Sequence, residues 1–166
     1  NIRTLKLTYS LDIVDFFMAY HYYVPFIVNY CRNFPRPKIM EIGIDDGTTV
    51  FSVIQRFTTL GDRSMGTAVQ QFEYMGIDVN VKEHISNTVH LMARSQSNSA
   101  IYLIELNSLE FLPSLVEGKF ACDDNHTVYD PDQAFTVIMI DGDHNYYTVS
   151  QELALVVQLA NENTLI

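Results

Sequence analysis

The sequence predicts an α/β protein with a doubly wound, mostly parallel sheet, helices on both faces and further helices at its N-terminus. Two observations support this prediction. Short apolar runs alternate along the chain with segments in which apolar residues recur at helical spacing. The run at 135–140 is almost continuously apolar, which is typical of a strand buried on both faces of a parallel sheet.

Residues 1–37 are expected to form an N-terminal helical cap and a linker. Ser10 suits the N-cap of a helix over 11–22. A second helix is expected to follow an interruption near Pro25, and the proline-rich segment 33–37 is expected to be a linker. The aromatic side chains of the first helix are an expected surface for homo-oligomer formation, while the oligomeric state itself stays open.

Residues 38–166 are expected to form the main domain. Its expected strands are 38–42, 72–77, 100–106, 135–140 and a fifth that begins at Thr164. Its expected helices run from Gly47 to about Phe57, and over 81–96, 109–115 and 145–161. Segments 58–71 and 118–134 are expected to be loops. The chain stops inside the fifth strand, which suggests that it is part of a longer protein.

The net charge of −10 over 166 residues argues against nonspecific binding of nucleic acid or of an anionic membrane surface. The apolar segment 11–31 contains Asp12 and Asp15, which argues against a membrane span. Cys31 and Cys122 have no metal-binding spacing, and two reduced thiols are typical of a cytoplasmic protein.

Polar residues stand at or near the ends of four predicted strands. They are Glu41, Asp78, Asn107 and Asp141. In a doubly wound sheet, ligands bind beyond the carboxyl ends of the strands, at the point where the strand order reverses. The sequence therefore predicts a ligand site at this edge.

The first strand is followed by a turn that contains Gly43 and Gly47 and leads into a helix. Glycines allow backbone N–H groups to approach a ligand closely at a helix N-terminus. The turn lacks the G-x-G-x-x-G arrangement of dinucleotide sites, because Asp45 stands where a second glycine is often found. Asp45 and Asp46 would repel a diphosphate. The pattern favours a ligand with a ribose, bound by Asp78, and a cationic or zwitterionic group.

Three elements carry a family resemblance: the turn Glu41-x-Gly43-x-x-x-Gly47, the acid Asp78, and Asp141-Gly142-Asp143-His144 shortly before Tyr146. With them the chain resembles the class I S-adenosylmethionine-dependent methyltransferases, whose fold is Rossmann-like. The likeness covers about 39–166. It is strongest to the group with an Asp-Gly-Asp-His motif after strand 4, which includes O-methyltransferases of sugars and natural products. The resemblance implies methylation of a small hydroxylated molecule. It also implies two more strands beyond Ile166.

The resemblance implies roles around the methionine part of the cofactor. Gly43 and Gly47 would let the backbone approach it. Glu41 would hold the turn or the amino group, and Thr49 would bind the carboxylate.

The resemblance also implies roles around the nucleoside. Asp78 would accept the ribose hydroxyls. Asn107, followed by Ser108, would lie at the adenine edge, where the family often has an acid.

In metal-dependent members of this family, the acid that ends the fourth strand binds the metal and a base follows three residues later. The resemblance implies that Asp141 binds Mg²⁺ and that His144 removes a proton from the substrate hydroxyl. The family's other metal ligands would lie beyond Ile166.

Other roles and functions stay open. His144 or Asp143 could instead cap the following helix, and Tyr146 and Tyr147 are expected to be packing residues. The alternative functions are a nucleoside- or nucleotide-binding module without methyl transfer and, with less support from the first turn, an NAD-dependent oxidoreductase.

Overall fold

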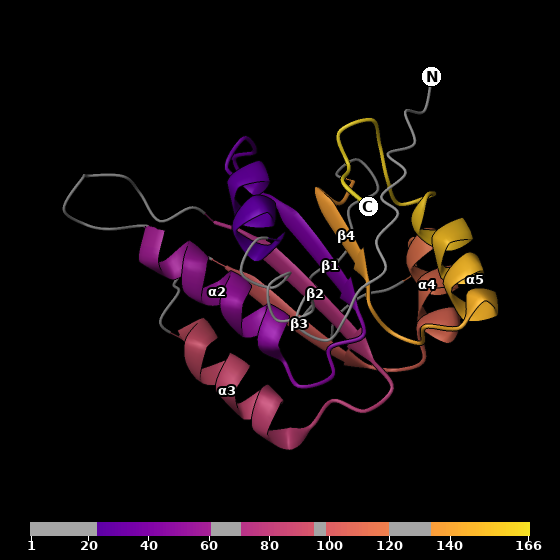
Figure 1. Ribbon diagram of the computed structural model, residues 1–166, viewed down its shortest axis with the longest axis horizontal. Coiled ribbons are helices and arrows are strands. Elements are labelled where there is room, and N and C mark those ends of the chain that lie inside the picture. Colours follow the sequence, from indigo (N-terminus) through magenta and orange to yellow (C-terminus); the bar gives the residue numbers. More distant parts are fainter. Residues whose placement is uncertain (1–22, 61–70, 95–98, 120–133) are drawn as a thin grey trace, which may run out of the picture.

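The computed structural model describes residues 23–60, 71–94, 99–119 and 134–166. In this part of the chain, four strands form one parallel sheet in the order β3-β2-β1-β4 (Figure 1). The strands are β1 (Lys38–Ile42), β2 (Glu73–Asp78), β3 (Ala100–Glu105) and β4 (Val137–Ile140). The chain winds outward from β1 to β3 and then returns to the other side of β1. This reversal confirms the predicted doubly wound, Rossmann-like arrangement.

Helices cover both faces of the sheet (Figure 1). They are a helix over 23–31, α2 (Thr48–Leu60), α3 (Glu83–Arg94), α4 (Ser108–Val116) and α5 (Tyr146–Val156). The helix over 23–31, α2 and α3 share one buried cluster with the sheet, and α4 and α5 share the other. The predicted α/β class with helices on both faces is therefore confirmed.

The strands divide their side chains between these two clusters. Ile39 and Tyr74 belong to the cluster on the α2 side, whereas Met40 and Met75 belong to the cluster on the α4 side. Successive side chains of a strand point to opposite faces, so a strand covered on both faces is mostly apolar along its length. This is why continuous apolar runs, rather than alternating ones, located the strands.

The N-terminal helix differs from its prediction. Pro25 lies within the helix over 23–31, so the predicted interruption near this residue is absent from that segment. Val24, Ile27, Val28 and Cys31, spaced as one helical stripe, pack into the α2-side cluster. Burial raises the pKa of the Cys31 thiol to about 12. The predicted helix over 11–22, the oligomer surface on it, and Cys122 lie outside the described residues.

The C-terminal segment also departs from its prediction. α5 ends at Val156 rather than near residue 161, and the chain turns so that Leu159 is buried in the α4-side cluster. The predicted fifth strand is present as one parallel bridge between Val137 and Leu165, on the free edge of β4.

Gly43 holds the ends of β1 and β4 together. Its φ of +89° lies in the left-handed region. A Cβ atom here would lie 2.5 Å from both the Asp141 carbonyl oxygen and the Gly142 Cα. The two strand ends can approach this closely only because residue 43 has no side chain.

We expect Gly43→Ala to lower the free energy of unfolding by about 2–4 kcal/mol, since it adds a backbone clash to left-handed strain. Gly118→Ala is the matched control, because its φ is +66° and nothing lies within 4 Å of an added Cβ. This control should cost about 1 kcal/mol. Urea denaturation measures both. Equal losses of stability in the two variants would show that the close approach of β1 and β4 does not require a residue without a side chain at position 43.

Candidate functional site

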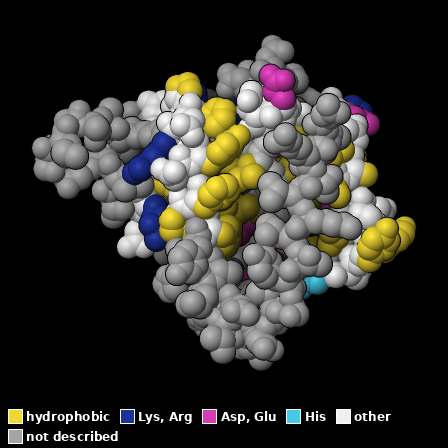
Figure 2. Space-filling view, turned by 45° about the horizontal axis from the view of Figure 1, so that its top comes forward, with side chains coloured by type: hydrophobic (Ala, Val, Ile, Leu, Met, Phe, Trp, Pro, Cys, Tyr) yellow, Lys and Arg dark blue, Asp and Glu magenta, His cyan; other side chains and the backbone are white. Residues whose placement is uncertain are grey.

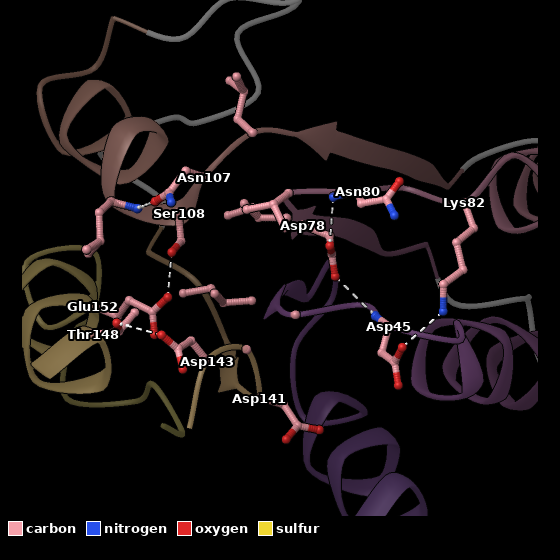
Figure 3. A pocket seen from close by; sticks show the side chains of 17 residues that line it. Asp45, Asp78, Asn80, Lys82, Asn107, Ser108, Asp141, Asp143, Thr148 and Glu152 are labelled. Carbon is pink, nitrogen blue, oxygen red and sulfur yellow. Dashed lines mark hydrogen bonds and ion pairs between the residues drawn. The ribbon is translucent and has the colours of Figure 1, made fainter. Parts of the chain in front are cut away.

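A pocket of about 510 Å³ lies beyond the carboxyl ends of the strands (Figure 3). Its walls come from the turn after β1, the ends of β2, β3 and β4, and the first half of α5. The volume lies in the range of small-molecule sites, about 300–1,000 Å³. The pocket is therefore the candidate functional site.

The pocket brings together only part of the predicted site. The predicted residues that line it are Gly43, Asp78, Asn107, Ser108 and Asp141. Those that do not line it are Glu41, Gly47, Thr49 and His144. For Gly47 the reason is packing, because a Cβ there would meet the Phe51 ring at 2.9 Å.

Asp78 links the end of β2 to the turn after β1. Its Oδ2 accepts the N–H groups of Ile44 and Asp45 at 2.8 and 3.1 Å. Its Oδ1 accepts the Asn80 N–H at 2.9 Å. A carboxylate has about four lone-pair directions, so Asp78 can still accept hydroxyl donors from the pocket. It also stabilises the turn.

The N–H groups of the turn mostly donate within the protein. Gly43 donates to the Ile77 carbonyl at 2.8 Å, and Thr48 donates to the Asp46 carboxylate at 2.9 Å. The Asp78 carboxylate accepts two further N–H groups of the turn, those of Ile44 and Asp45. A phosphate bound here would have to displace the Asp78 carboxylate. The turn is thus poorly suited to hold a diphosphate.

Asp45, at the position of the missing second glycine, lies in the left-handed region with a φ of +44°. Its carboxylate pairs with Lys82 at 3.0 Å, at one end of the pocket (Figure 3). Hydrogen bonds from Thr48 lower the pKa of Asp46, which does not line the pocket. Of the two acids expected to repel a diphosphate, Asp45 therefore lines the pocket as part of an ion pair, and Asp46 does not line it.

The opposite end of the pocket joins α4 to α5. Asn107 is the N-cap of α4, and its Oδ1 accepts the Leu109 N–H at 2.9 Å. Ser108 donates its hydroxyl to Glu152 Oε1 at 2.5 Å. Glu152 is only 1% exposed. The sequence prediction missed Glu152, although a glutamate on the same helical stripe as the buried Val156 was a signal of a special role.

Asp141 and His144 are unequally placed. Asp141 lines the pocket, where partial enclosure raises the pKa of its carboxyl; the charge of His144 lowers this pKa and that of Asp45 raises it. His144 is exposed and does not line the pocket. The two side chains interact electrostatically, but the predicted base is not part of the pocket lining.

The start of α5 corrects two expectations. Asn145, not Asp143 or His144, is the N-cap, and its side chain accepts the Thr148 N–H. Asp143 supports the cap by accepting the Thr148 hydroxyl at 2.9 Å. Tyr146 and Tyr147 are 88% and 72% exposed, so the expectation that they pack in the interior is wrong. The first turn of α5 projects them into solvent.

Glu41 and Thr49 lie behind the pocket wall, in the α2-side core. Glu41 is 2% exposed and accepts a hydrogen bond from the Tyr74 hydroxyl. Thr49 shares a 2.8 Å hydrogen bond with the Tyr23 hydroxyl. Burial raises the pKa of Glu41 to about 8, opposed by its hydrogen bonds with Tyr74 and Thr49. These residues therefore support the turn from inside the fold, and their predicted contact with a methionine group is not seen in this pocket.

The pocket is strongly acidic. Among the described residues that line it, the carboxylates are Asp45, Asp78, Asp141, Asp143 and Glu152, and Lys82 is the one lysine or arginine. Within the described residues, no group of three His, Cys, Asp or Glu side chains could hold a metal ion. The described residues around Asp141 therefore do not fit a Mg²⁺ site.

Comparison with models of known protein families finds no match, and no curated protein is significantly similar in sequence. The methyltransferase resemblance therefore stays a prediction. In the described part of the chain, no helix has both the length and the apolar character to cross a membrane. On the face shown in Figure 2, the Lys and Arg side chains of the described residues form no continuous basic surface.

We expect Glu41→Gln to stabilise the protein above neutral pH. A raised acid pKa means that the folded state keeps a proton that the unfolded chain releases above about pH 4.5. The free energy of unfolding should therefore fall by up to about 1.4 kcal/mol for each pH unit between pH 4.5 and 8. Glutamine does not titrate, so it removes this loss. The variant should therefore have a higher free energy of unfolding than wild type at pH 8 and the same value near pH 4.5.

Urea denaturation at pH 5, 6.5 and 8 measures the difference. Glu105→Gln, at an exposed position at the end of β3, is the matched control and should show no such trend. A stability difference between Glu41→Gln and wild type that stays constant with pH would contradict the proton held on Glu41.

Proposed function

We propose that this protein binds S-adenosylmethionine in the pocket and transfers its methyl group to a small hydroxylated molecule, such as a sugar or other natural product. The observation that carries the proposal is the acidic pocket at the point where the strand order reverses, whose described lining residues include five carboxylates and one lysine. A sulfonium and an α-amino group carry the positive charge that this lining attracts.

The charge of the pocket discriminates between ligand classes. A dinucleotide brings a diphosphate, which would face both the carboxylates and a turn whose N–H groups already donate to Asp78 and to other protein acceptors. An adenosyl ligand brings ribose hydroxyls, which donate to carboxylates. The proposal therefore favours an adenosyl cofactor over a nicotinamide dinucleotide.

The cofactor would supply an electrophilic methyl group on its sulfonium, and the chain's residues would bind and orient it. Asp78, central in Figure 3, would accept the ribose hydroxyls with lone pairs that the turn leaves unused. Asn107 would offer chiefly its NH₂ donors, because its oxygen already accepts the Leu109 N–H. Asp141, whose backbone adjoins Gly43, would take the amino group that the resemblance assigned to Glu41.

One observation favours a second candidate function, a nucleoside-binding module without methyl transfer. His144 is the predicted base, yet it is exposed and outside the pocket lining. Deprotonation of a bound substrate requires a base within hydrogen-bond reach of the hydroxyl. Under the leading proposal, the acceptor would bind at the mouth of the pocket, between Asp141 and His144.

We expect S-adenosylhomocysteine to bind, and Asp78→Asn to weaken its binding at least about tenfold, because the ribose hydroxyls lose a charged acceptor. Asn retains one oxygen for the turn, whereas Asp78→Ala would also leave two N–H groups without their acceptor. Asp46→Asn is the matched control from the same turn, and it should change the affinity less than threefold. Isothermal titration calorimetry measures all three.

Three results would oppose this proposal in whole or in part. Failure of folded wild-type protein to bind S-adenosylhomocysteine would end the methyltransferase hypothesis. Tight binding of NADH instead would promote the oxidoreductase. Equal weakening by Asp78→Asn and Asp46→Asn would remove the ribose assignment alone.

The role of His144 can be separated from cofactor binding. We expect His144→Ala to keep the affinity for S-adenosylhomocysteine within twofold and to lower methyl transfer by about 10²–10⁴-fold, the usual contribution of a general base. Transfer of a radiolabelled methyl group to a panel of sugars and phenols measures the rate. An unchanged rate would show that a group other than His144 removes the substrate proton. If no compound in the panel is methylated, the result favours the nucleoside-binding module.

A further inference from the structure

One oxygen of the Glu152 carboxylate, Oε2, is buried and has no hydrogen-bond partner among the residues that the structure describes. The other oxygen accepts the Ser108 hydroxyl. Glu152 belongs to the pocket lining although it is 1% exposed. Native proteins rarely leave a buried carboxylate oxygen without a donor, so this oxygen marks a place where a ligand donor would be stabilised.

The position of Glu152 restricts where that donor can lie. Its side chain reaches from α5 toward the N-terminus of α4, on the side of Asp78 away from Lys82 (Figure 3). A ligand whose ribose lies at Asp78 would therefore place its base on the side of Glu152 and its charged chain elsewhere.

Two exposed aliphatic side chains of the pocket wall suit a flat ring. Val79 follows β2 and Leu106 follows β3; they are 67% and 46% exposed, and both line the pocket. A planar base between the two strand ends would cover this apolar surface. Its edge would then face the polar groups of α4 and α5.

We propose that Glu152 recognises the exocyclic amino group of an adenine ring, which donates to Oε2, while Val79 and Leu106 contact the ring. This inference rests on the proposed function for the identity of the ligand as an adenosyl compound. It adds a specificity-determining residue on α5, which the motifs of the sequence did not indicate.

The proposal predicts discrimination between adenine and hypoxanthine. Deamination replaces the amino donor by a carbonyl oxygen, which would face the carboxylate oxygen and be repelled. In Glu152→Gln, the amide can keep the Ser108 hydrogen bond through its oxygen and present its NH₂ group to the ligand. This NH₂ group repels the adenine amino group and donates to the hypoxanthine carbonyl, so the preference should reverse.

The experiment titrates the full chain with S-adenosylhomocysteine and S-inosylhomocysteine, and with adenosine and inosine, by calorimetry. Wild type should prefer each adenine compound over its hypoxanthine counterpart by about 10–100-fold. Glu152→Gln should remove or reverse this ratio. Glu162→Gln, at an exposed position outside the pocket lining, is the matched control and should keep the wild-type ratio.

The outcomes separate this inference from the proposed function. Binding of S-adenosylhomocysteine without discrimination, or a ratio that Glu152→Gln leaves unchanged, overturns the role of Glu152 and leaves the cofactor proposal standing. Binding of adenosine without S-adenosylhomocysteine overturns the cofactor proposal, and the adenosine-to-inosine ratio then decides the role of Glu152. Absence of binding by all four compounds overturns both. The wild-type ratio needs no variant, so a misfolded variant does not remove the test.

Discussion

The backbone contact between Gly43 and the end of β4 is the constraint on which the rest of the candidate site depends. The Asp141 N–H donates to the Ile42 carbonyl at 2.8 Å, which holds the two strand ends in register. The missing side chain of Gly43 then lets the turn pass directly over Asp141 and Gly142. Since β1 lies between β2 and β4, this approach brings the ends of all described strands to the wall of one pocket.

The same polar groups serve the fold and the site. Asp78 holds the first turn through two N–H groups while it lines the pocket, and Ser108 begins α4 while it binds Glu152. Local costs are concentrated in this region, including the left-handed Asp45 and the Glu152 oxygen that has no hydrogen-bond partner in the described part of the chain. Unfavourable local features of this kind cluster at functional sites, where a ligand or the surrounding structure compensates for them.

The sequence predicted the strands well because both of their faces are buried. The apolar runs of β1 and β2 need no knowledge of their neighbours to be recognised. Helix ends were harder, as α5 shows by ending at Val156 so that Leu159 can enter the core. The single bridge of Leu165 to β4 also depends on a pairing partner far away in the sequence.

The site residues also divide into those recognisable from the local sequence and those that depend on distant partners. Asp78, Asn107 and Asp141 were found because their positions after strands are visible in the sequence, and parallel strands end at one edge. Lys82 and Glu152 were missed because their meaning comes from partners in other elements, namely Asp45 and Ser108. Glu41 and Thr49 stand beside the same turn in sequence, yet strand alternation and the first turn of α2 direct them into the core.

By itself, the sequence determined the α/β class, the order of the elements and the edge of the sheet at which a ligand would bind. The pocket lies at this edge, but ligand binding there stays a prediction. These features follow from hydrophobic periodicity and from glycine and polar residues at strand ends, which are local properties of the chain. Only the tertiary structure decided which polar side chains line the pocket, which are buried behind it and which charges are paired. Such choices depend on contacts between residues 30 or more positions apart, such as Asp45 with Lys82, and no local pattern encodes the distance between them.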